Sequence, residues 1–140
     1  MSTIVPKGSW PVMLTPFLDD QSIDWHGVDA LTDWYIASGS AGLFAVCLSS
    51  EMYHLTDDER TALASRVVRH AAGRVPVVAT GTFGGTVEEQ AHTIVRMAET
   101  GVAAVVVSVN QLACAEEADA VWQQRAEHLL ALTGELPLGF

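Results

Sequence analysis

The stretch AGLFAVCLSSEMYHLTDDER, residues 41–60, decides the fold class of this chain. It opens with an apolar run over residues 41–46, passes through a small polar loop at Ser49 and Ser50, and closes on a helix start at Thr56. This order predicts a strand, a loop at the carboxyl end of that strand, and then a helix. In α/β proteins such loops hold ligands, because side chains and free backbone N–H groups converge there.

The same order of strand and helix recurs along the chain. Asp24, Thr56 and Thr86 are each typical of a helix N-cap, and the last two open capping boxes that end at Glu59 and Glu89. A fourth helix is expected over residues 116–132, with Val121, Trp122, Leu129 and Leu130 facing inward. The predicted strands cover residues 11–14, 41–46, 75–79, 102–107 and 136–140.

The spacing of these elements indicates the fold class. Strand starts repeat about every 30 residues, which is the length of one βα unit. About four and a half such units predict an α/β protein with a parallel sheet and right-handed crossovers. Periodicity does not separate an open doubly wound sheet from half of a (β/α)₈ barrel, and a complete barrel needs roughly 200–250 residues.

Composition excludes several classes of function. The net charge is −10, from 17 acidic and 7 basic residues, so nucleic acid and anionic membrane surfaces are repelled. No apolar run approaches the ~18–20 residues of a membrane span, and the first residues do not resemble a signal peptide. Cys47 and Cys114 are two isolated cysteines, so a reducing cytoplasm is the expected location.

Four segments carry a family resemblance. PVMLTPFLDDQSID, GLFAVCLSSEMYHLTDDER, GRVPVVATGTFGGT and ELPLGF, in this order and spacing, closely resemble the dihydrodipicolinate synthase / N-acetylneuraminate lyase family. The resemblance runs from about Lys7 to Phe140. It implies the N-terminal half of a TIM (β/α)₈ barrel, in which residues 1–140 form one partial domain that stops in the fifth strand.

The resemblance also implies a chemistry. Members of this family are lyases or aldolases that handle pyruvate or a related 2-oxo acid as a Schiff base on a lysine of the sixth strand. No cofactor is implied, and a full-length relative is expected to form a homo-oligomer. That lysine, and a tyrosine that follows the fifth strand, would lie beyond Phe140, and Lys7 is the only lysine here. The isolated chain is therefore expected to be inactive.

The site residues are carried over from one motif. The family's Gly-Thr-Thr-Gly-Glu corresponds to CLSSE, residues 47–51. The resemblance implies that Ser49 helps to pass a proton, and that Leu48, Ser49, Ser50 and Asn110 bind the substrate. Leu48 weakens the hydroxyl relay, although backbone N–H groups can still hold a carboxylate. Asn110 and Gln111 stand where a tyrosine pair usually follows the fourth strand, so the specificity must differ from that of well-known members.

Other interpretations stay open at this point. The chain is alternatively a non-catalytic half-barrel fragment, or a self-associating module whose strand edges pair with another chain. A third interpretation is an open flavodoxin-like sheet that binds a phosphate-bearing ligand at residues 81–85, although the lysine of a P-loop is absent. The five histidines lack metal-site spacing, so no metal is expected.

Overall fold

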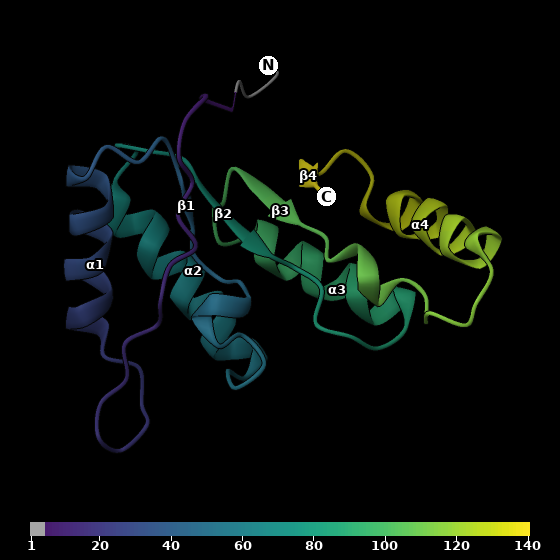
Figure 1. The fold of residues 1–140 in the computed structure, drawn as a ribbon, viewed down its shortest axis with the longest axis horizontal. Coiled ribbons are helices and arrows are strands. Elements are labelled where there is room, and N and C mark those ends of the chain that lie inside the picture. The colour runs from purple at the N-terminus through teal and green to yellow at the C-terminus, as the bar shows by residue number, and fades with distance from the viewer. Residues whose placement is uncertain (1–4) are drawn as a thin grey trace.

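Four helices and four short strands alternate along the chain (Figure 1), which confirms the predicted alternation but gives one strand fewer than the five expected. The structure is a computed structural model that describes residues 5–140. The helices are α1 (Trp25–Ala37), α2 (Asp57–Ala71), α3 (Val87–Ala98) and α4 (Asp119–Thr133). The strands are β1 (Leu43–Phe44), β2 (Val77–Thr80), β3 (Ala104–Val106) and β4 (Leu138–Gly139). Two 3₁₀ turns, η1 (Leu48–Ser50) and η2 (Val109–Gln111), follow β1 and β3.

The order of the strands settles which α/β fold this is. The sheet runs β1-β2-β3-β4, and all of its pairs are parallel. A doubly wound sheet needs a point where the strand order reverses, whereas a barrel adds each strand beside the previous one. The sequential order therefore identifies half of a (β/α)₈ barrel.

The strand predicted at residues 11–14 is reduced to a single parallel bridge between Val12 and Phe44. Two backbone hydrogen bonds hold this segment beside β1. The Met13 N–H donates to the Phe44 carbonyl at 2.9 Å, and the Phe44 N–H donates to the Pro11 carbonyl at 3.0 Å. The segment thus takes the place of a barrel strand at the free side of β1, with too few ladder bonds to count as a strand.

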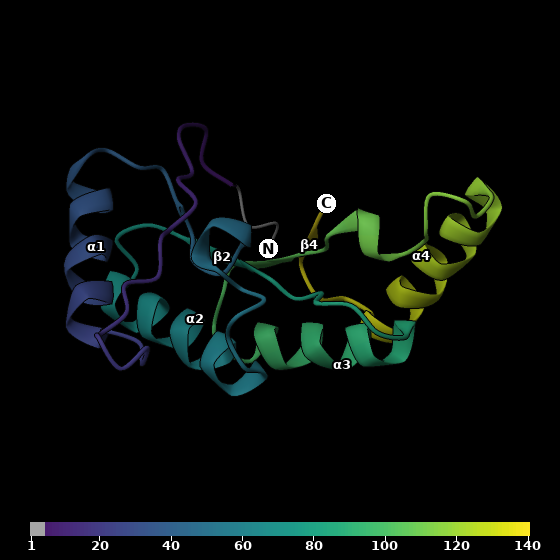
Figure 2. The same cartoon turned by 60° about the horizontal axis from the view of Figure 1, so that its bottom comes forward.

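One face of the sheet is buried and the other is open. Leu43, Ala79 and Val105 are fully buried beneath the helices. On the other face, Val12, which forms a single bridge with Phe44, is 45% exposed. Figure 2 shows α2 and α3 lying along the same side of the strands. The core thus lies between the sheet and its helices. The face that would line a barrel interior carries no helix, and its residues in β1 to β3 are half-buried, except Thr80, which is buried.

The helix starts follow the predicted capping chemistry. The Thr56 hydroxyl accepts from the Glu59 N–H at 3.2 Å, and the Glu59 carboxylate accepts from the Thr56 N–H at 2.8 Å. Thr86 and Glu89 repeat both bonds at the start of α3. These reciprocal bonds satisfy N–H groups that have no partner inside the helix, so both helices begin at the residue that the sequence predicts.

The fourth helix departs from its prediction at both its start and its face. It begins at Asp119 rather than residue 116, because the Glu117 carboxylate binds the Cys114 N–H and Arg125 and closes the preceding loop. Trp122 and Leu130 were expected inward, but they are 38% and 44% exposed. The buried positions of this helix are Ala126, Leu129 and Thr133.

Candidate functional site

The carboxyl ends of β1, β2 and β3 open onto loops that contain η1, the glycine-rich segment 81–85, and η2. Neighbouring parallel strands point the same way, so these loops lie along one rim of the sheet. All four residues predicted to bind substrate lie on this rim. Leu48, Ser49 and Ser50 form η1, and Asn110 lies in η2.

Ser50 is the buried anchor of the η1 turn. Its hydroxyl lies 2.7 Å from the Met13 carbonyl and 3.0 Å from the Ala45 carbonyl, and it accepts from the Cys47 N–H at 3.2 Å. Its own carbonyl accepts from the Thr15 hydroxyl at 2.8 Å. The Ser50 side chain therefore ties η1 to the segment beside β1, and it is fully buried, so a ligand on the rim does not reach its hydroxyl.

Ser49 and Leu48 occupy the opposite, exposed side of the same turn. Leu48 is 72% exposed, and the Ser49 side chain makes no hydrogen bond to residues 5–140. The N–H groups of Ser50 and Glu51 donate to the carbonyls of Cys47 and Leu48. Within the described residues, the N–H groups of Leu48 and Ser49 have no acceptor. The turn therefore presents two free backbone donors and one free hydroxyl at the carboxyl end of β1.

Asn110 is exposed on η2, and its side chain makes no hydrogen bond within residues 5–140. Its neighbour Gln111 is bonded on both sides. The Gln111 side-chain nitrogen donates to the Tyr53 hydroxyl at 2.6 Å, and its side-chain oxygen accepts from the Gly84 N–H at 2.7 Å. The rim loops are thus connected by side chains as well as by the sheet.

The three comparisons with known proteins agree on one family. The sequence profile of the Dihydrodipicolinate synthetase family matches residues 5–111, most of the chain. The chain belongs to the dihydrodipicolinate synthetase family. Over 83 residues it is 39% identical to the 4-hydroxy-tetrahydrodipicolinate synthase of Polynucleobacter asymbioticus, an alignment that covers 59% of this chain and 27% of that protein.

Solved structures show the same fold. A dihydrodipicolinate synthase superposes on 94% of this chain with a TM-score of 0.82 and 23% identity, and 44% of that protein is covered. YagE, a prophage protein of this family from E. coli K12 in complex with pyruvate, matches 91% of the chain with a TM-score of 0.79 and 27% identity, over 42% of its own length. The chain thus spans less than half the length of these relatives.

Several contacts of the rim residues have no signal in the sequence. Ser50 is among the residues predicted to bind the substrate, but the buried contact of its hydroxyl with the Met13 carbonyl is visible only in three dimensions. Tyr53 and Gln111 meet across 58 positions, which no local pattern encodes. Thr15 belongs to the TPF segment that marks the dihydrodipicolinate synthetase family, so the motif itself is the signal for that residue.

Two charged side chains that follow η1 in the sequence, Glu51 and Arg60, already have partners. The Glu51 carboxylate lies 3.3 Å from the His54 ring, and both side chains are exposed. The Arg60 guanidinium donates to the Met52 carbonyl at 2.7 Å and stacks 4.1 Å from the centre of the Phe83 ring. Arg60 therefore connects α2 to the loop after η1. The donors of the turn that have no partner within residues 5–140 are backbone N–H groups and a hydroxyl.

The glycine-rich loop after β2 is poorly suited to a phosphate. A side chain at Gly81 would meet Val105 at 2.3 Å, so this glycine serves the close packing of β2 on β3. The Gly84 N–H already donates to Gln111, and Glu89 caps the helix that follows. The neighbouring carboxylates of Glu88 and Glu89 disfavour an anion, so the loop is better suited to packing beside the site.

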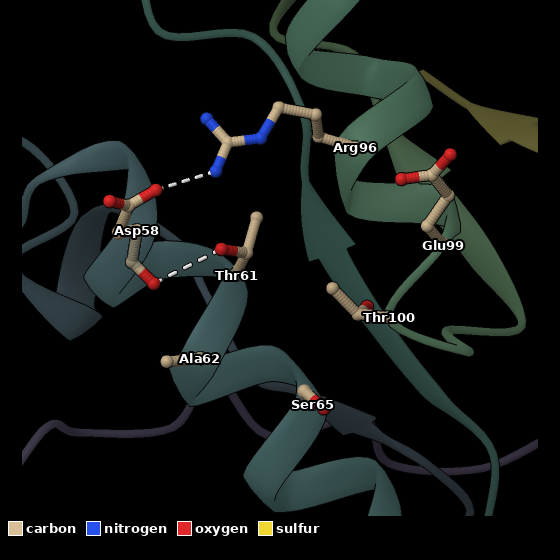
Figure 3. Close-up of a pocket in the computed structure, with 7 residues that line it drawn as sticks. All are labelled: Asp58, Thr61, Ala62, Ser65, Arg96, Glu99 and Thr100. Carbon is tan, nitrogen blue, oxygen red and sulfur yellow. Dashed lines mark hydrogen bonds and ion pairs between the residues drawn. The ribbon is translucent and has the colours of Figure 1, made fainter.

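A separate pocket of about 380 Å³ lies between α2 and α3 (Figure 3). Arg96 reaches across it to Asp58 at 2.7 Å, and the Thr61 hydroxyl donates to the Asp58 carbonyl at 3.0 Å. Its lining residues come from α2, from Arg96 of α3 and from the turn that follows α3 at Glu99 and Thr100, rather than from the rim loops. In a family whose fold places sites at the carboxyl ends of strands, this pocket is a groove between outer helices.

Residues 5–140 contain neither a helix that could span a membrane nor a cluster of metal-binding side chains. The helices described there are too short and too polar for any of them to cross a bilayer. No group of three or more His, Cys, Asp or Glu side chains gathers in this range as a metal site requires.

Proposed function

We propose that the η1 turn holds the carboxylate of pyruvate or a related 2-oxo acid, in a lyase or aldolase of the Schiff-base type. One observation carries the proposal. The backbone N–H groups of Leu48 and Ser49 and the Ser49 hydroxyl have no hydrogen-bond partner within residues 5–140, and both residues are exposed. Such convergent donors are suited to a carboxylate, because each bond to a charged oxygen is stronger than a bond to a neutral one.

Each predicted residue has a distinct part in this proposal. Ser49 supplies the free hydroxyl, which contacts the carboxylate and helps to pass a proton. Leu48 contributes its N–H, while its exposed side chain offers an apolar surface. Ser50 shapes the turn from beneath, and Asn110 contacts the far end of the substrate from η2. YagE is a family member described in complex with pyruvate, which supports the choice of substrate class.

The proposal includes no covalent step for the 140 residues alone. Schiff-base formation needs a lysine amine, and the only lysine is Lys7, which lies ahead of the segment beside β1 and away from the rim. Treatment with pyruvate and borohydride is expected to leave the mass of the 140-residue chain unchanged. A reduced adduct on Lys7 would contradict this part.

Calorimetric titration tests the binding part of the proposal. Pyruvate is expected to bind, and pyruvamide, which lacks the carboxylate, is expected not to. The change Ser49→Ala should weaken pyruvate binding about tenfold, because it removes one charge-assisted hydrogen bond. Equal affinity for pyruvate and pyruvamide would exclude a carboxylate site.

A second candidate function rests on the uncovered face of the sheet. Val12 and Leu14, at the free edge of the sheet beside β1, are 45% and 57% exposed. Apolar side chains along an unpaired strand edge favour association with another chain. We infer that the 140-residue chain pairs through this face, in the manner of an interaction module.

A cytoplasmic location also remains a proposal, and the two free cysteines support it.

A further inference from the structure

Gln111 is the point where the three rim loops meet. Its side chain bonds Tyr53, which lies after η1, and Gly84, which lies after β2, while Gln111 itself ends η2 after β3. These partners are 58 and 27 positions away in the chain. A single amide therefore connects segments that the sheet joins only through their strands.

The orientation of this amide is fixed by its partners. The Gly84 N–H can only donate, so the side-chain oxygen of Gln111 must face it at 2.7 Å. The nitrogen then faces the Tyr53 hydroxyl at 2.6 Å and donates to it. Reversing the amide would place two N–H donors against each other at Gly84, so the arrangement has one hydrogen-bonding solution.

The backbone of Gln111 is held from below by a second glutamine. Gln90 is 1% exposed, and its side-chain nitrogen donates to the carbonyls of Gln111 and Gly85, both at 3.2 Å. A buried donor with two acceptors restrains the backbone on which the Gln111 side chain is mounted. The Gln111 side chain that contacts Tyr53 is therefore attached to a restrained backbone segment rather than to a freely moving loop.

We propose that Gln111 is a positioning residue for the carboxylate-binding turn, an inference that rests on the proposed function. Ser50 fixes η1 on the side of the Met13 carbonyl, and Gln111 fixes the following segment at Tyr53 on the side of β2 and β3. With both fixed, the free N–H groups of Leu48 and Ser49 keep one orientation. Gln111 acts through Tyr53 and does not itself touch the substrate.

The test uses the 140-residue chain, with amide hydrogen exchange at Gly84 and calorimetry of pyruvate as two readouts. Gln111→Leu removes both bonds and should speed Gly84 exchange at least tenfold and weaken pyruvate binding about fivefold. Tyr53→Phe removes one bond and should weaken pyruvate binding while leaving Gly84 protected. Gln111→Glu keeps the acceptor for Gly84 and a partner for the phenol, and should restore most of the affinity.

The matched control is Gln123→Leu, which removes a glutamine amide bonded to Glu127 on the exposed face of α4. It should change neither readout. If wild-type chain binds pyruvate and Gln111→Leu binds it equally well, the positioning role is overturned while the proposed function stands. If wild-type chain binds no pyruvate, the proposed function fails. Positioning for a ligand then fails with it, and unchanged Gly84 exchange in Gln111→Leu would overturn the network itself.

Discussion

At the residue scale, the two neighbouring serines of η1 have opposite environments and opposite expected effects. Ser50→Ala leaves the Met13 carbonyl and the Cys47 N–H buried without their partner. We expect it to lower the free energy of unfolding by about 1–3 kcal/mol, the cost of unsatisfied buried groups. Urea unfolding followed by circular dichroism measures this loss.

Ser49→Ala is the matched control for that stability measurement. The Ser49 side chain is exposed and has no partner within residues 5–140, so its loss should change stability by less than about 0.5 kcal/mol. The same variant is expected to lose pyruvate affinity. Comparable stability losses in the two variants would show that Ser50 is not the anchor of the turn.

Gln90 gives a second prediction at this scale. Its side-chain oxygen is buried and has no hydrogen-bond partner among residues 5–140, while its nitrogen donates to two carbonyls. Gln90→Glu should destabilise the chain, because burial raises the pKa of the introduced carboxyl group above its unfolded value. Such a group costs more stability as pH rises. The urea midpoint of the variant should therefore lie further below that of wild type at pH 8 than at pH 5.

The control for this pH dependence is Gln124→Glu, which introduces a carboxyl group on the exposed surface of α4. Its urea midpoints should follow those of wild type at both pH values. A Gln90→Glu variant that is equally stable at pH 5 and pH 8 would mean that position 90 is solvated in solution.

At the element scale, a charge network joins α1 to α2. Arg66 donates to both carboxylate oxygens of Asp29, and its Nε atom lies 2.8 Å from the Oδ1 atom. The hydrogen bond from Arg66 holds the pKa of Asp29 below its ordinary value, and the charge of His70 adds to this effect. The pKa of Asp33 is likewise lowered, by hydrogen bonds from His70 and Arg74.

These lowered pKa values give a pH dependence of stability. A carboxyl group with a depressed folded pKa contributes its full stabilisation above its unfolded pKa of about 3.9. That contribution is lost as pH falls through this value towards the folded pKa. Asp29→Asn should therefore lower the free energy of unfolding at pH 7, and its difference from wild type should shrink below about pH 4. Asp19→Asn, at an exposed loop position, is the matched control and should change the free energy of unfolding at pH 7 by less than about 0.5 kcal/mol.

Elements were predictable wherever their signals are local. The two capping boxes set the starts of α2 and α3 because each pairs residues three positions apart. The start of α4 was not predictable, because Glu117 bonds Arg125 eight positions later and so belongs to the loop. The outward orientation of Trp122 was missed because its ring N–H reaches the Val109 carbonyl on η2, a contact with no sequence signature.

At the scale of the whole molecule, the open sheet face predicts concentration-dependent association. Each copy carries a net charge of −10, so repulsion opposes pairing and should weaken it at low ionic strength. Sedimentation velocity should show a larger species that grows with protein and salt concentration. Val12→Lys, at an exposed edge position, should return the chain to a monomer. A monomer at every concentration and salt level would dismiss the interaction module.

The fold was accessible from sequence in its order of elements but not in its closure. Strand and helix repeats predicted a parallel sheet, and the family motifs pointed to half a barrel. The sequential strand order that distinguishes a barrel from a doubly wound sheet came only from pairings such as Leu43 with Val77. At the site, the motif located η1. Which serine is buried as the anchor of the turn, and which is exposed, could be seen only in the structure.

The most direct test of the account is an amide chemical-shift titration of the 140-residue chain with pyruvate. The account predicts saturable shifts that are largest at Leu48 and Ser49, whose N–H groups have no acceptor within residues 5–140, with smaller shifts at Asn110. Shifts that gather instead in the groove between α2 and α3 around Arg96, or an unchanged spectrum at saturating pyruvate, would contradict it.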